Sequence, residues 1–233
     1  GVYMMYLKFS DGTECLIPNA IWISSEYRKT LIIGHLSDAH LTKSGGDYDA
    51  MGYFMTNNEG TISALTYLML KGVDLIVVSG DVADISSDAS SYSAWIDFLI
   101  FTTLNDMPVY LGKGNHDDPP TMYAKYIAPP YFNVTIDDFE LIFLDSGGDR
   151  GYPTMENLKW AEEVLANAEG KFKVFVVHHP PFTAWQWWQP GSQDPPFYGW
   201  VNGSVEEEQW TWTNGTHTET RTWTDFLYVS NAK

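Results

Sequence analysis

The chain has 233 residues, 44% of them hydrophobic and 15% aromatic, which is long and apolar enough for a folded core and excludes a disordered chain. Lys and Arg number 13 against 30 Asp and Glu, and the net charge of −17 disfavours nucleic acid as a partner because it repels phosphate backbones. No apolar run approaches the roughly 18 residues of a membrane span, and a single cysteine, Cys15, excludes a disulfide framework or a Cys-rich zinc module.

The first 29 residues are expected to be β-rich. Short apolar runs at 3–9, 15–17 and 21–23 surround an Asp11-Gly12 turn. We expect residues 1–29 to be a short N-terminal segment, either the end of an upstream module or a flap. Residues 30–233 are expected to form the main domain, with an aromatic-rich loop insertion at 182–212.

From residue 30 onwards, strand and helix patterns alternate. Apolar runs predict strands at 30–36, 73–79, 108–111 and 172–177, helices are expected at 58–71, 90–103 and 154–168, and a hairpin-like pair at 132–136 and 140–144. Gly72 occupies the position at which helices commonly end. Near-continuous apolar strands separated by helices indicate an α/β fold with its sheet covered on both faces.

Four of these strands end in polar residues. In chain order the candidates are Asp38 and His40, then Asp81 and Asp84, then Asn115 and His116, and finally His178 and His179. The loops at the carboxyl ends of strands converge in one crevice of an α/β sheet, so these side chains are expected to meet. Oxygen and nitrogen donors without thiolate suit Mn, Fe or Zn. The set is too large for one tetrahedral ion, and a shared carboxylate would bridge two ions about 3.5–4 Å apart.

Each motif alone also has a purely structural interpretation. Asp-x-His is a common loop tripeptide, Gly-Asn-His-Asp is a favourable turn sequence, and His-His-Pro-Pro could merely end a strand before a rigid turn. The order of all four, each after an apolar strand, favours a functional site.

In this order the motifs resemble the calcineurin-like metallophosphoesterase superfamily. The motifs are Asp38-x-His40, Gly80-Asp81-x-x-Asp84, Gly114-Asn115-His116-Asp117 and His178-His179-Pro180. The resemblance implies a β-sandwich of two mixed sheets flanked by helices. It also implies two divalent or trivalent metal ions, with Mn, Fe or Zn the candidates, and a small phosphate monoester or diester as substrate.

The resemblance further assigns roles to individual residues. Asp38 and His40 would hold the first metal, Asp81 would bridge both metals, and Asn115 and His178 would hold the second. His178 is preferred over His179 because the family pattern is His-x-Pro. A metal-bridging hydroxide would attack phosphorus while His116, outside the coordination sphere, assists the leaving group. Asp84 is expected to fix a histidine or its loop rather than to bind metal.

The sequence departs from the family at its last motif, Gly-His-x-His, which is missing. The nearest candidate, Gly215-Thr216-His217-Thr218, has one histidine and the wrong spacing. We therefore expect the fold to be incomplete at this end, with the missing histidines shortly after Lys233. The alternative function is a catalytically impaired, aromatic-rich secreted binding module on the same fold.

Location and assembly are less constrained. The tryptophan-rich composition and the Asn-x-Ser/Thr sequons at Asn133, Asn202 and Asn214 favour an extracellular or cell-surface protein, with a cytoplasmic one as the alternative. The crowded aromatic residues of 182–212 could form a substrate-pocket wall or simply pack the loop onto the sheet. The oligomeric state stays open.

Overall fold

The structure is a computed structural model that describes residues 1–42, 56–146, 153–168 and 171–179, together with short strands between 200 and 221. Its elements in chain order are β1 (Val2–Lys8), β2 (Glu14–Trp22), β3 (Ile33–Leu36), α1 (Asn57–Leu70), β4 (Leu75–Val78), α2 (Ala89–Leu104), β5 (Val109–Leu111), α3 (Thr121–Tyr126), β6 (Phe132–Ile136), β7 (Phe139–Phe143), α4 (Met155–Asn167) and β8 (Phe172–Val176). The strands β9 (Trp200–Val201), β10 (Ser204–Val205), β11 (Trp210–Asn214) and β12 (His217–Arg221) follow.

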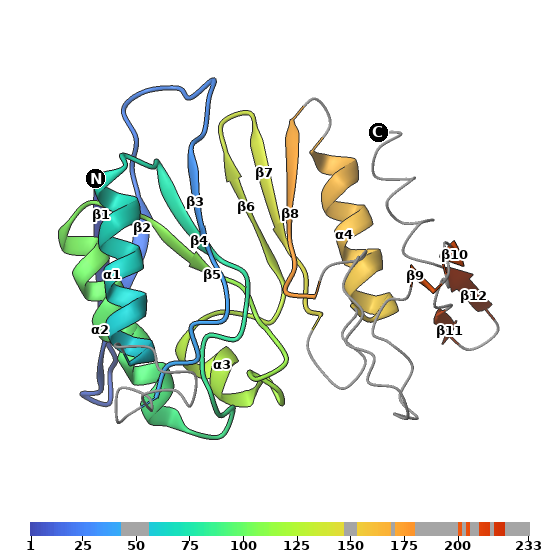
Figure 1. Ribbon diagram of the computed structural model, residues 1–233, viewed down its shortest axis with the longest axis horizontal. Helices are drawn as coiled ribbons and strands as arrows, with labels where there is room; N and C mark the ends of the chain where they lie inside the picture. The colour runs from blue at the N-terminus through green and yellow to red at the C-terminus, as the bar shows by residue number, and fades with distance from the viewer. Residues whose placement is uncertain are drawn as a thin grey trace.

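The first sheet has the order β3-β4-β5 and is parallel throughout its described strands. Because strand side chains alternate between faces, β4 divides its apolar residues between two cores. Ile76 and Val78 pack with Leu65 of α1 and Trp95 of α2. Figure 1 shows both helices on this outer side of the sheet.

The second sheet has the order β6-β7-β8, with β6 antiparallel to β7 and β7 parallel to β8. Leu141 and Phe143 of β7 share a core with Leu75 and Val77 of β4, so the two sheets pack face to face. The opposite face of β7, including Ile142, packs against α4. The layers are therefore helix, sheet, sheet and helix, as Figure 1 shows.

This arrangement confirms the predicted sandwich and corrects one detail of the prediction. Each three-stranded sheet is covered by helix on one face and by the other sheet on its second face. A continuous apolar strand cannot distinguish the two kinds of cover, because both bury its side chains. The sheet that contains β3, β4 and β5 is parallel rather than mixed over the described residues.

Side-chain caps explain why the helices begin where they do. Thr56 and Glu59 form a reciprocal capping box at α1, Asp88 accepts from the Ser90 amide at α2, and Thr154 accepts from the Asn157 amide at α4. The sequence did not predict α3, which has six residues, too few for a helical period to be recognised.

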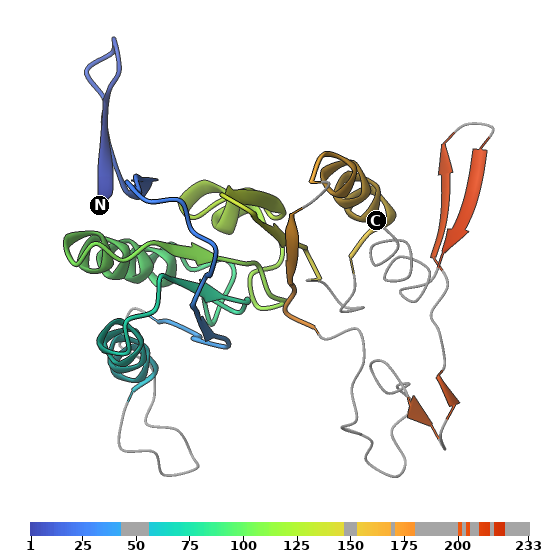
Figure 2. The ribbon, with the colours of Figure 1, turned by 90° about the horizontal axis from the view of Figure 1, so that it is seen from above.

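Within residues 1–29, β1 and β2 form a hairpin that projects from the body in Figure 2. Its base is fixed at the end of α2 and the start of β5. The Asn19 backbone amide donates to Thr103 Oγ1 (2.8 Å), and the Asn19 side chain pairs with the Met107 carbonyl (2.9 Å) and the Val109 amide (3.0 Å). These bonds join the hairpin to the first sheet and α2, while its assignment as a separate segment stays a prediction.

The region predicted as an aromatic loop contains strands. β9 pairs with β10, and β11 pairs with β12 in register from Trp210↔Arg221 to Asn214↔His217. Alternating Trp and Thr in 210–213 is typical of a strand, a pattern that the loop interpretation overlooked. Segment 182–199, including Trp185, Trp187 and Trp188, lies outside the described residues. Among the described helices, none has the length and apolarity to cross a membrane.

Candidate metal centre

The backbone at the carboxyl ends of β3 and β4 continues to pair beyond the strands. The amides of Asp38, His40 and Leu41 donate to the carbonyls of Gly80, Asp81 and Val82 at 3.2, 2.9 and 3.1 Å. Asp38, His40 and Asp81 adopt positive φ angles of 56°, 44° and 49°. Non-glycine residues with positive φ carry backbone strain, and such strain clusters at functional sites. The unusual conformation thus coincides with the predicted ligands.

Two glycines permit the close approach of the loops. A Cβ atom on Gly114 would lie 2.1 Å from Asp81 Oδ1 and 2.2 Å from its backbone nitrogen. A Cβ atom on Gly80, which also has φ +120°, would lie 2.7 Å from His178 Cβ. All three distances are far below van der Waals contact, so these positions accept no side chain.

We expect Gly114→Ala to displace the Asp81 carboxylate, because the atoms that the new methyl group would meet are the carboxylate and backbone of Asp81. The affinity for Mn²⁺ should fall at least tenfold. Gly60→Ala in α1 is the matched control, since a Cβ there meets nothing within 4 Å. Titration with Mn²⁺ measures both variants, and unchanged affinity in Gly114→Ala would contradict the assigned packing.

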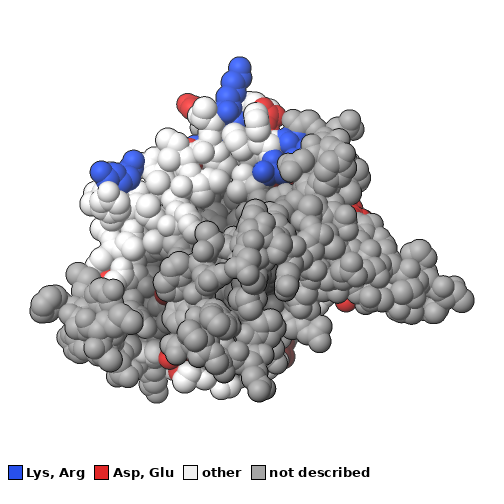
Figure 3. All heavy atoms as spheres, turned by 45° about the vertical axis from the view of Figure 1, so that its right-hand side comes forward, with Lys and Arg blue, Asp and Glu red and all other residues white. Residues whose placement is uncertain are grey.

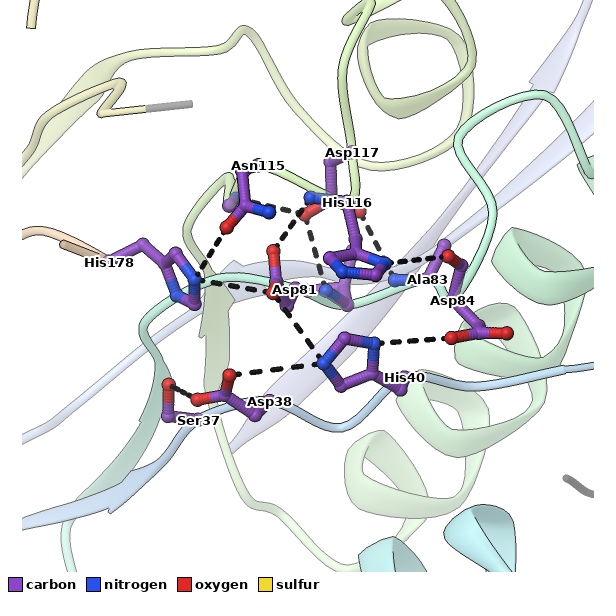
Figure 4. A network of polar contacts seen from close by, with 12 residues as sticks. Ser37, Asp38, His40, Asp81, Ala83, Asp84, Asn115, His116, Asp117 and His178 are labelled. Carbon is purple, nitrogen blue, oxygen red and sulfur yellow. Dashed lines mark hydrogen bonds and ion pairs between the residues drawn. The ribbon is translucent and has the colours of Figure 1, made fainter. Parts of the chain in front are cut away.

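Asp81 is the centre of the site (Figure 4). It is 3% exposed, and its Oδ1 accepts a 2.8 Å hydrogen bond from the His116 amide. Its Oδ2 lies 3.5 Å from His40 Nε2 and 3.2 Å from His178 Nε2. Asp81 therefore presents one carboxylate to two imidazoles that approach from different strands, β3 and β8.

The remaining predicted ligands lie beside this carboxylate. Asn115 Oδ1 is 3.1 Å from His178 Nε2, and Asp38 Oδ1 is 3.8 Å from His40 Nε2. Donor atoms of two groups each lie within 4.8 Å of one another: His40, Asp81 and His116, and Asp38, Asp81 and His178. Both groups contain Asp81, and together they hold five of the six predicted site residues. The sixth, Asn115, joins them through its contact with His178. This grouping places His116 among the possible donors, where the resemblance had put it outside the coordination sphere.

Electrostatics favour ionised carboxylates at this position. The close contact with His40 lowers the pKa of Asp38 to about 2, and it raises the pKa of His40 in return. Burial would raise the pKa of Asp81, but the hydrogen bond and charge of His178 outweigh it, so the pKa is lowered. Burial likewise opposes protonation of His178, yet Asp81 raises the His178 pKa. The carboxylates are therefore held as anions that attract cations.

Asp84 contacts two histidines, as expected. Its Oδ1 lies 3.3 Å from His40 Nδ1, and its backbone carbonyl lies 2.9 Å from His116 Nδ1. A carbonyl only accepts, so His116 Nδ1 carries the proton and Nε2 is left for the site. His179 differs from His178, because its Nδ1 lies 2.7 Å from the Ser146 carbonyl. The distances favour His178 as the ligand.

Asp117 is a supporting residue to which the sequence analysis gave no role. It is fully buried and accepts hydrogen bonds from the amides of Val82 (3.2 Å), Ala83 (3.1 Å) and Gly114 (2.9 Å). Burial raises the pKa of Asp117. The carboxylate ties the loop after β4 to the loop after β5, and its only sequence signal was its place at the end of Gly-Asn-His-Asp.

The donor set fits a pair of divalent ions. Carboxylate, amide and imidazole donors without thiolate suit Mn, Fe or Zn rather than a structural zinc module. A buried carboxylate that belongs to two donor groups could serve both ions of such a pair. His217, the alternative source of a missing histidine, begins β12, and its side chain lies outside the described residues.

The curated proteins to which this chain is similar include two phosphodiesterases. A probable cyclic nucleotide phosphodiesterase of Fibrobacter succinogenes is 31% identical over 162 residues, covering 66% of this chain and 59% of that protein. A glycerophosphodiester phosphodiesterase of Enterobacter lignolyticus is 28% identical over 167 residues, covering 65% and 57%. The chain thus spans less than two thirds of the length of both relatives.

Among solved structures, a dimetal phosphatase from Danio rerio has a TM-score of 0.48 at 11% identity, covering 64% of this chain and 69% of that chain. The family model described as calcineurin-like phosphoesterase matches residues 31–208, which contain every predicted ligand motif. The chain therefore belongs to the calcineurin-like phosphoesterase family.

Proposed function

We propose that this chain carries the two-metal site of a phosphodiesterase. The observation that supports it best is the sharing of Asp81 between two groups of donors, His40 with His116 and Asp38 with His178. The family resemblance would place Asp38 and His40 on one ion and Asn115 and His178 on the other, whereas the donor distances group Asp38 with His178 and His40 with His116. Asp81 is common to both divisions, so the bridging role does not depend on which one holds. When bound, two such ions supply an activated water and neutralise charge on the phosphoryl group.

His116 is proposed to protonate the leaving oxygen. Its Nδ1 proton is held by the Asp84 carbonyl, and its backbone amide is held by Asp81, so the ring is fixed from two sides. In the imidazolium form Nε2 carries the transferable proton. The edge-on contact with the His40 ring, with centroids 4.5 Å apart, places His116 beside the metal ligands.

The charge of the site favours diesters over monoesters. The charges of Asp38 and Asp81 would be offset by the bound ions, but Asp84, which is exposed and is not a proposed ligand, keeps its negative charge beside the site. Lys113, just before the Gly114 loop, is buried and paired with carboxylates. In the described part of the face in Figure 3, Lys and Arg side chains are few and scattered. A diester brings one negative charge and a monoester dianion brings two, so the diester is repelled less.

Hydrolysis of two chromogenic esters with the same leaving group tests this proposal. We expect the Mn²⁺-loaded protein to cleave bis(p-nitrophenyl) phosphate with a kcat/KM at least tenfold above that for p-nitrophenyl phosphate. Preference for the monoester would overturn the substrate class. Absence of hydrolysis with two ions bound would overturn the enzymatic role and favour the alternative, a binding module.

The extracellular location stays a prediction. Of the sequon residues, Asn133 lies in β6, where its amide donates to Glu140 Oε1 at 2.6 Å, and Thr135 Oγ1 donates to Glu140 Oε2 at 2.7 Å. Glycosylation of Asn133 would have to break this bond to a buried carboxylate. This sequon therefore gives no support to a secreted protein.

A further inference from the structure

The proposed ligands of the second ion come from different sheets. Asn115 follows β5 of the first sheet, and His178 follows β8 of the second, yet their side chains lie 3.1 Å apart. Their spacing therefore depends on how the loops after these two strands are held to one another across the sandwich. Metal sites lose affinity when ligands are misplaced, and residues behind the ligands usually fix them.

Lys113 occupies the base of the Asn115 loop. Its side chain is fully buried, although an ammonium group is costly to remove from water unless it is paired. Its Nζ forms an ion pair with Asp118 and a second with Asp145 Oδ1 at 2.9 Å. Asp118 lies just beyond the Gly-Asn-His-Asp motif, so the first pair closes the loop at its base. Asp145 follows β7, so the second pair crosses to the other sheet.

The connection continues from Asp145 to the His178 loop. Its neighbour Ser146 is fully buried, and Ser146 Oγ accepts a 3.0 Å hydrogen bond from the His179 amide. The Ser146 carbonyl lies 2.7 Å from His179 Nδ1. The Asp145 amide donates to Asn157 Oδ1 of α4 at 2.9 Å, which fixes this segment to its helix. A continuous series of contacts thus joins the Asn115 loop to the His178 loop.

We propose that Lys113 is a positioning residue whose ion pair with Asp145 sets the spacing of Asn115 and His178 and hence the affinity for the second metal ion. This inference rests on the proposed two-metal function. Lys113 does not touch the reacting atoms in this account. Its effect on the site passes through the backbone on either side of the ion pair.

Lys113→Met tests the proposal because it keeps the length of the side chain and removes its charge. We expect the first Mn²⁺ to bind within about twofold of the parent affinity and the second to bind at least tenfold more weakly. The electron paramagnetic resonance spectrum should change from a spin-coupled pair to an isolated Mn²⁺ ion under conditions that load both sites of the parent.

Lys171→Met is the matched control. Lys171 also pairs with a buried carboxylate, Glu140, at 3.2 Å, but at the start of β8, away from the site. The control should lower the melting temperature and leave both metal affinities unchanged. If Lys113→Met also binds both ions like the parent, or weakens both equally, the positioning role is wrong.

Asp145→Asn provides a second variant in case Lys113→Met does not fold. It keeps the Lys113–Asp118 pair and weakens the ion pair that crosses the sandwich. We expect the same selective loss of the second ion, and parent-like affinity for that ion would overturn the proposal. A parent protein that binds fewer than two ions would instead overturn the proposed function, so the two failures are distinguishable.

Discussion

Asp81→Asn is expected to abolish binding of both metal ions, whereas loss of any other predicted ligand should weaken mainly one. Asp81 is the carboxylate that both donor groups share, and its Oδ2 faces both His40 and His178. The side-chain amide of asparagine keeps the shape of the aspartate side chain but lacks its charge and one of its acceptor oxygens. Hydrolysis of the diester should fall by about three orders of magnitude or more, since metal activation of water is lost.

Asp137→Asn is the matched control for this substitution. Asp137 also adopts a positive φ (48°), and its carboxylate also accepts a hydrogen bond from a backbone amide, that of Arg28 at 2.8 Å. It lies in the turn between β6 and β7 rather than at the site. Metal content by elemental mass spectrometry and diester hydrolysis are measured for both variants. Retention of both ions by Asp81→Asn would contradict a bridging role.

His116→Gln is expected to keep both ions and lose turnover. General acid catalysis contributes about 10²–10⁴-fold, and the benefit is largest when the leaving oxygen is basic. The variant should therefore lose more activity on an alkyl phosphodiester than on a p-nitrophenyl diester. The hydrolysis rates of the two diesters, measured together with the metal content, distinguish a proton donor from a metal ligand.

His35→Gln provides the comparison for that variant, because His35 bonds Ser79 Oγ at 2.9 Å on β3 and lies outside both donor groups. Its turnover should stay near that of the parent protein. Equal losses on the two diesters by His116→Gln, or loss of an ion, would contradict the assigned proton transfer and make His116 a metal ligand.

The order of the elements was predictable because the strands of the two sheets are short, largely apolar segments bounded by turn residues. The apolar runs that contain β4 and β7 predicted strands, and Gly72 marked the end of α1. The apolar runs could not reveal whether a helix or the other sheet packs on each face of a sheet. Leu75 and Ile76 are equally apolar neighbours, yet one faces the second sheet and the other faces α1 and α2.

The predicted ligands were recoverable because the carboxyl ends of parallel strands converge and the motifs occur in a fixed order. The residues that support these ligands could not be predicted from the sequence. Lys113 is a charged residue before a glycine, and nothing in its neighbourhood along the chain indicates burial between Asp118 and Asp145. Asp117 likewise looks like a turn residue until its three backbone partners are seen. Contacts between distant segments determine both roles.

Anomalous diffraction from crystals of the Mn²⁺-loaded protein tests the two-metal site most directly. The account predicts two peaks about 3.5–4 Å apart on either side of the Asp81 carboxylate. One peak should lie near Asp38 and His40, and the other near Asn115 and His178. A single peak, or two peaks that do not share Asp81, would contradict the bridged centre on which the proposed activity depends.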